Sequence, residues 1–291
     1  MTDYLTTKEL AAYLRIKERK VYDLAASGQV PCSRAMGKLL FPKAAVETWL
    51  AAQSSGPKET GAAPRPPVFL GSHDPLLDWA LRESRCGIAS YFDGSLDGLN
   101  RFANREGIAT GLHLYDSETQ SWNEPDVRRA CGGQPVVLVT WCRRERGLIV
   151  GEAHASTIRG LTDLHGLRVA SRQPEAGAQI LFQDLCDRAG LGKDAFVSGE
   201  ACRTEVDAVL AVSEGKADAA FGLHAHAVQF RLPFVPVIEE RFDLLVDRRA
   251  WFEPAMQTLL AFCAGSAFRA RVEDLAGYAI DTFGEVRFNG P

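Results

Sequence analysis

Residues 68–75 read Val-Phe-Leu-Gly-Ser-His-Asp-Pro, a short apolar run that leads directly into a helix start. The apolar residues suit a buried strand, Asp74 suits an N-cap, and Pro75 suits the first helical position. The same order recurs at 88–98 and at 167–178, where apolar runs precede Asp-Gly-Ser-Leu-Asp-Gly and Arg-Gln-Pro-Glu-Ala-Gly-Ala. Strands and helices that alternate in this way predict an α/β body with mostly parallel sheets, covered on both faces.

These three strand-to-helix turns are candidates for a ligand site. Free backbone N–H groups at a helix start attract anions, and clefts form where the strand order of a sheet switches. Ordinary helix capping explains any one turn by itself, but three in one body favour a shared cleft. The candidate ligand-binding residues are Ser72, His73, Asp93, Gly94, Ser95, Arg172, Gln173, Glu175 and Gly177.

Residues 54–67 separate this body from a small N-terminal head. The segment is rich in Pro, Gly, Ser and Ala and lacks apolar periodicity, which predicts a semi-extended linker between domains 1–53 and 68–291, with an ordered surface loop as the alternative. Residues 1–53 hold eight Lys and Arg and five acids, a net charge of +3; because the whole chain carries −4, the remainder carries −7. A basic head on an acidic body indicates a polyanion-binding module.

The head reads as helix, tight turn, helix, β-wing and helix. Thr6 and Glu9 have the spacing of a capping box, and a second helix is expected from Glu18 to Ser27, before Gly28. Two short strands are expected between residues 30 and 41, and Pro42 suits the first turn of a last helix.

In this order of elements, the segments Leu5-Thr6-Thr7-Lys8-Glu9-Leu10-Ala11, Val21-Tyr22 and 37–50 resemble the excisionase and MerR-type winged helix-turn-helix family. The resemblance implies double-stranded DNA as a partner, with the second helix in the major groove and the wing on the flanking backbone. It also implies a homodimer on a two-fold operator, because one such head neutralises few phosphates. The candidate DNA-binding residues are Lys17, Arg19, Lys20, Tyr22, Arg34 and Lys38, with Arg19 and Lys20 foremost.

The body resembles the type 2 periplasmic-binding-protein fold, in the branch fused to helix-turn-helix heads. The matching segments are 71–77, 94–99, 111–116, 147–150, 217–219 and 239–244. The resemblance implies two lobes, the second at about 166–236, with a small ligand between them, and it adds Asp218 to the ligand-binding candidates. It points first to an oxyanion such as molybdate or tungstate.

Two carboxylates depart from that family pattern. Asp93 and Glu175 stand near positions where the family has hydroxyls, and a carboxylate beside a dianion is unfavourable. Either these acids face away, or the ligand is a polar organic acid or an amino-acid-like metabolite, whose carboxylate Arg172 could pair with.

The remaining features favour a cytoplasmic, non-enzymatic regulator. The chain has no signal peptide and no apolar run near the roughly 20 residues that cross a bilayer, so no membrane partner is expected. No catalytic motif is present, His224 and His226 alone do not complete a metal site, and no cofactor is expected. Residues 143–146 are expected to form a solvated turn. An excisionase-like architectural factor, whose body only recruits a protein partner, is the alternative.

Overall fold

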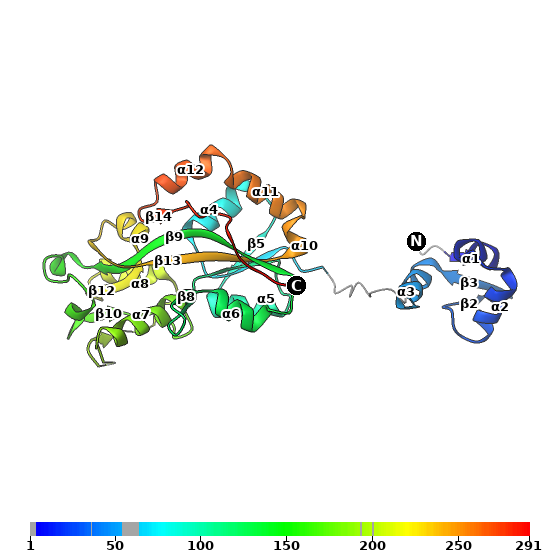
Figure 1. Cartoon of the computed structure of the whole chain (residues 1–291), viewed down its shortest axis with the longest axis horizontal. Coiled ribbons are helices and arrows are strands. Elements are labelled where there is room, and N and C mark those ends of the chain that lie inside the picture. Colours follow the sequence, from blue (N-terminus) through cyan, green and yellow to red (C-terminus); the bar gives the residue numbers. More distant parts are fainter. Residues whose placement is uncertain (1–3, 36, 54–63, 193, 200) are drawn as a thin grey trace. The chain divides into compact units, whose positions relative to one another are not determined.

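The computed structural model describes residues 4–35, 37–53, 64–192, 194–199 and 201–291 (Figure 1). The chain divides into two compact units, Met1–Pro64 and Arg65–Pro291. Most of the predicted linker, 54–63, lies outside the described residues. Its end belongs to the larger unit, because Arg65 is buried there and its Nε donates to Asp247 Oδ2 at 2.9 Å. That unit therefore begins before the predicted boundary at Val68.

The small unit is the predicted winged helix-turn-helix. Thr6 and Glu9 form the predicted capping box, with Thr6 Oγ1 accepting from the Glu9 N–H and Glu9 Oε2 accepting from the Thr6 N–H. Leu10, Val21 and Phe41 form its buried core. Pro42 ends a strand, one residue before the helix that it was expected to begin. The elements are β1 (Tyr4–Thr6), α1 (Thr7–Leu14), α2 (Glu18–Ala26), β2 (Ser33–Ala35), β3 (Lys38–Pro42) and α3 (Lys43–Gln53), with antiparallel sheet order β1-β3-β2.

The large unit has the α/β fold of two lobes joined by two long strands (Figure 1). Its main sheet has the order β11-β10-β12-β9-β13-β6-β4-β5. The connecting strands are β9 (Val136–Val150) and β13 (Phe234–Asp247), which pair with each other antiparallel. In each lobe one set of shorter strands pairs parallel, as predicted: β4 with β5 and β6, and β10 with β11 and β12.

The first lobe begins with the predicted strand-to-helix turn at residues 71–75. Helices α11 and α12 return to pack against α4. The lobe contains β4 (Val68–Gly71), α4 (Pro75–Ser84), β5 (Ala89–Phe92), α5 (Ser95–Ala103), β6 (Ala109–Leu112), β7 (Tyr115–Asp116), β8 (Ser121–Trp122) and α6 (Glu124–Cys131). The chain closes with α10 (Arg248–Trp251), α11 (Pro254–Cys263), α12 (Ser266–Glu273), β14 (Tyr278–Ala279) and β15 (Val286–Asn289).

The second lobe has its own buried cluster, which includes Leu148, Phe182 and Phe221. It contains β10 (Arg168–Ala170), α7 (Gly177–Arg188), β11 (Val197–Ser198), α8 (Glu205–Ser213), β12 (Ala219–Leu223) and α9 (His224–Gln229). Each lobe has buried clusters of its own, and β9 and β13 connect the two lobes. No described helix in either unit is both long and apolar enough to cross a membrane.

The two connecting strands correct the prediction of a solvated turn at 143–146. Residues Arg143 to Arg146 lie inside the 15-residue strand β9, and the side chains of Arg144 and Arg146 are buried. Its partner strand β13 is likewise continuous from Phe234 to Asp247. A run of charged residues, considered without its partners, suggests a solvated turn. Here Arg144 and Arg146 lie buried in a strand because carboxylates from neighbouring elements neutralise them.

Candidate functional site

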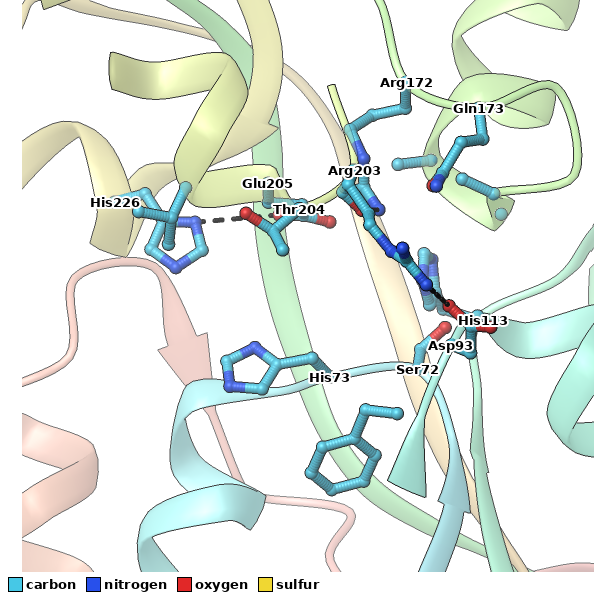
Figure 2. Close-up of a pocket in the computed structure, with 16 residues that line it drawn as sticks. Ser72, His73, Asp93, His113, Arg172, Gln173, Arg203, Thr204, Glu205 and His226 are labelled. Carbon is cyan, nitrogen blue, oxygen red and sulfur yellow. Dashed lines mark hydrogen bonds and ion pairs between the residues drawn. The ribbon is translucent and has the colours of Figure 1, made fainter. Parts of the chain in front are cut away.

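All three predicted strand-to-helix turns line a cavity of about 420 Å³ between the two lobes (Figure 2). This volume is typical of small-molecule sites. The first lobe contributes Ser72, His73, Phe92, Asp93, Gly94 and His113, and the second lobe contributes Arg172, Gln173, Ala176, Gly177, Ala178, Arg203, Thr204, Glu205, Val206 and His226.

Close glycine packing brings the first turn of α5 to the cavity. Gly98 of α5 lies so near the end of β4 that a Cβ on it would stand 2.2 Å from the Cα of Gly71. Gly94, the N-cap of α5, has φ of 112°, a conformation that L side chains rarely adopt. The helix can therefore begin directly beside Ser72.

A pair of serine hydroxyls forms the first-lobe wall. Ser72 Oγ and Ser95 Oγ lie 2.7 Å apart, and Ser95 Oγ accepts the backbone N–H of His113 at 3.1 Å. One hydroxyl hydrogen makes the bond between the serines, and the other has no acceptor among the described residues. This wall can donate a hydrogen bond to a ligand oxygen.

The second-lobe wall consists of two further helix starts. Gly177 and Ala178 begin α7, and their N–H groups have no acceptor among the described residues. Thr204 caps α8 through a capping box with Asp207. Arg172 supports this second start: its Nε and Nη2 donate to the carbonyls of Cys202 and Arg203 at 3.1 and 2.9 Å.

A buried chain of charges runs beneath the cavity from one lobe to the other. Asp74, the N-cap of α4, accepts from Arg144 at 2.8 Å, and Arg144 also donates to Glu240 of β13. Arg146 then donates to Glu240 at 2.7 Å and to Glu205 of α8 at 2.8 Å. Burial raises the pKa of Glu240, but Arg144 and Arg146 outweigh it, so the pKa lies well below its usual range and the carboxylate stays charged.

Two buried histidines of the cavity wall each face a carboxylate. His113 Nδ1 lies 3.3 Å from Glu240 Oε2, and His226 Nδ1 lies 3.6 Å from Glu205 Oε2. Burial lowers the pKa of His113, although Glu240 opposes this effect, so the neutral imidazole is favoured. His73 is half exposed and packs edge-on against Phe92.

The structure brings together most, but not all, of the predicted ligand residues. Ser72, His73, Asp93, Gly94, Arg172, Gln173 and Gly177 line the cavity, and Ser95 lies directly behind Ser72. Two of the predicted residues lie outside the cavity lining. Glu175 is exposed outside the lining, and Asp218 pairs with Arg168 at 2.6 Å, because it precedes β12 whereas the cavity lies beyond the other end of that strand.

Sequence reasoning missed His113, Arg203, Thr204, Glu205 and His226 as lining residues. The Thr204-to-Asp207 capping box was a usable signal, since it marks a fourth helix start in the same body. His226 had been considered only as a metal ligand. Among the described residues, no group of three or more His, Cys, Asp or Glu side chains could hold a metal ion.

The six predicted DNA-binding residues are all exposed on the small unit. Lys17 is the N-cap of α2, Arg19, Lys20 and Tyr22 lie on that helix, and Arg34 and Lys38 lie on the β2–β3 hairpin. None of them is used by the core of the unit, which leaves them available to a partner.

Comparison with known families identifies both units. Residues 79–264, more than half of the chain, match the PBP superfamily domain. The chain belongs to the PBP superfamily. Residues 4–54 match a helix-turn-helix domain, so this PBP-superfamily chain carries a helix-turn-helix at its N-terminus.

Relatives of this PBP-superfamily chain include an uncharacterized protein, YvgK, from Bacillus subtilis (strain 168), which is 26% identical over 98% of both chains. Similar solved structures include an ABC-type phosphate transport receptor from Vibrio cholerae, with 12% identity, a TM-score of 0.47 and coverage of 72% of this chain and 98% of that one. PhnD1 from Prochlorococcus marinus in complex with methylphosphonate has 9% identity, a TM-score of 0.49 and coverage of 73% and 90%.

Proposed function

We propose that this protein is a one-component transcription regulator, whose helix-turn-helix unit binds operator DNA while its PBP-like unit senses a small molecule. The observation that carries this proposal is the cavity of about 420 Å³ where turns from both lobes converge. A cavity shared by two lobes binds a ligand with different affinity as the lobes open or close, so the ligand biases the lobe arrangement.

Regulation then follows from coupling between the units. In a homodimer on a two-fold operator, lobe closure would change the DNA affinity of the paired heads, and by thermodynamic linkage DNA would change ligand affinity by the same factor. The exposed basic residues of α2 and of the β2–β3 hairpin are the proposed DNA contacts.

The proposed ligand carries an anionic group. The free hydroxyl hydrogen of the Ser72–Ser95 pair and the first N–H groups of α7 are suitable donors for it. Molybdate or tungstate would satisfy these donors, and so would a polar organic acid or an amino-acid-like metabolite. The cavity volume favours an organic ligand, because a tetrahedral oxyanion would fill only a small part of it.

A thermal-shift screen with molybdate, tungstate, sulfate, carboxylic acids and amino acids tests the sensor proposal. A specific ligand at a hundredfold excess over its Kd stabilises the protein by about 2.7 kcal/mol. The alternative, an architectural factor whose body only recruits a partner protein, predicts no specific stabilisation. The polar and charged side chains that both lobes contribute to the cavity wall favour the sensor.

A further inference from the structure

Glu205 gives one side of the cavity a negative charge. It lies in the first turn of α8, its side chain is 15% exposed, and it is among the residues that line the cavity. Arg146 Nη2 donates to its Oε1 at 2.8 Å. Its Oε2 accepts no hydrogen bond from the described residues, because His226 Nδ1, at 3.6 Å, is too distant.

This carboxylate is charged at neutral pH. Burial raises the pKa of Glu205, but Arg146 and His226 outweigh this effect and hold it well below the usual range. Oε2 has almost no accessible surface, so a ligand meets Glu205 at the exposed part of its side chain, where the carboxylate charge attracts a cation.

A buried histidine lies beside this carboxylate. His226 is buried, its Nδ1 faces Glu205, and its other ring nitrogen points away from that residue (Figure 2). The charge of Glu205 therefore favours a cationic donor group on the ligand.

The opposite side of the cavity favours an anionic group on the ligand. In Figure 2, Ser72 and Asp93 lie across the cavity from Glu205 and His226. Ser72 belongs to the donating serine pair, and the charge of Asp93 is offset by Arg203 Nη2 at 3.9 Å. The first N–H groups of α7 add further donors in the same cavity.

We infer that the ligand is a zwitterion, whose cationic nitrogen donor binds Glu205 while its anionic group lies on the Ser72 side. The inference rests on the proposed sensor function and narrows its ligand class. A simple oxyanion such as molybdate cannot donate to Glu205 and is repelled by its charge.

Matched pairs of probes test this inference on the full native chain. Thermal shift and titration calorimetry would compare the twenty proteinogenic L-amino acids with analogues that lack the amine, such as glutarate for L-glutamate and propionate for L-alanine. Molybdate, tungstate and phosphate complete the panel. We expect an amine-bearing acid to bind and its amine-free analogue to bind at least about 30-fold more weakly.

Substitution of Glu205 provides the second measurement. Glu205→Gln keeps an acceptor for Arg146 but removes the charge, so it should weaken binding of the amine-bearing acid by about 30-fold or more and bring its affinity close to that of the analogue. Glu214→Gln is the matched control, since Glu214 caps the other end of α8 and pairs with the exposed Lys216. The comparison of probes on the native chain stands even if Glu205→Gln folds poorly.

The possible results separate the two proposals. Binding of an oxyanion or an amine-free acid as tight as that of any amine-bearing acid, unchanged or improved by Glu205→Gln, would overturn the zwitterion inference and leave the sensor function intact. Failure of every probe to bind either protein would overturn both.

Discussion

At the scale of single residues, the site depends on close contacts that only small side chains permit. Gly98 rests on Gly71, and Gly177 lies so near His113 that a Cβ on it would stand 3.1 Å from the ring. These contacts place the starts of α5 and α7 at the cavity. The site geometry is therefore sensitive to added atoms at these glycines, including Gly98, which does not line the cavity.

Gly98→Ala should destabilise the large unit. In an open helix alanine is more favourable than glycine by about 1 kcal/mol, but here its Cβ would meet the Gly71 Cα at 2.2 Å and Thr110 Oγ1 at 2.6 Å. We expect a net loss of about 1–3 kcal/mol in the free energy of unfolding, measured by urea denaturation.

Gly133→Ala is the control for this change, because no atom lies within 4 Å of its Cβ position and its φ is ordinary. It should alter stability by no more than about 0.5 kcal/mol. Equal stability of the two variants would mean that α5 is not seated on β4 as described.

At this scale the sequence predicted which turns hold the candidate ligand residues, but it did not predict which of those side chains face the cavity. Ser72 and Asp93 follow strands directly, and that pattern was sufficient to place them. Glu175 lies in an equally suitable turn, but it is exposed outside the cavity lining. Glu205 lines the cavity from the first turn of α8, which was not among the three predicted turns. The direction of a side chain depends on how the two lobes pack together. The sequence of a single turn does not determine that packing.

At the scale of elements, β9 and β13 carry the buried charges that connect the lobes. Arg144, Arg146 and Glu240 lie side by side on these strands and reach Asp74 in one lobe and Glu205 in the other. The sequence predicted a turn at residues 143–146 and could not show that the arginines lie within a strand, because their partners are distant in the chain.

Arg144→Met should destabilise the protein much more than Arg143→Met. Loss of Arg144 leaves Asp74 and Glu240 buried without their shared cation, at a cost of about 3–5 kcal/mol. Arg143, its neighbour in the same strand, pairs with exposed Glu239 and Asp281, so its loss should cost about 1 kcal/mol or less. Urea denaturation would measure the free energy of unfolding of both variants. Similar losses of stability in the two variants would contradict a buried charge network around Arg144.

The same network predicts a loss of stability in acid. The folded-state pKa values of Glu240 and Glu205 lie below the unfolded value of 4.5, so the unfolded chain binds protons first as the pH falls. Their stabilisation is complete above that value and declines below it. The unfolding temperature should fall between about pH 4.5 and pH 3, less steeply in Glu240→Gln than in the native chain. Identical slopes for the two proteins would contradict this assignment.

At the scale of the whole molecule, composition and charge predicted a basic, polyanion-binding N-terminal module on an acidic body, whereas the DNA-binding and receptor assignments came from the resemblance of sequence motifs to known families. Both units match known families, and the body shows the predicted two lobes around a polar cavity. The identity of the ligand was not predictable, because it depends on how residues from both lobes combine. The proposed regulation requires that the two units communicate.

Fluorescence anisotropy of labelled operator DNA, at fixed salt, tests this communication most directly. Each compound that raises the unfolding temperature would be added to the native chain and to Arg19→Ala/Lys20→Ala, in which DNA binding should be weak throughout. We expect at least one such compound to change the operator affinity of the native chain by about fivefold or more. An affinity that stays constant with every stabilising compound would contradict the regulator proposed here.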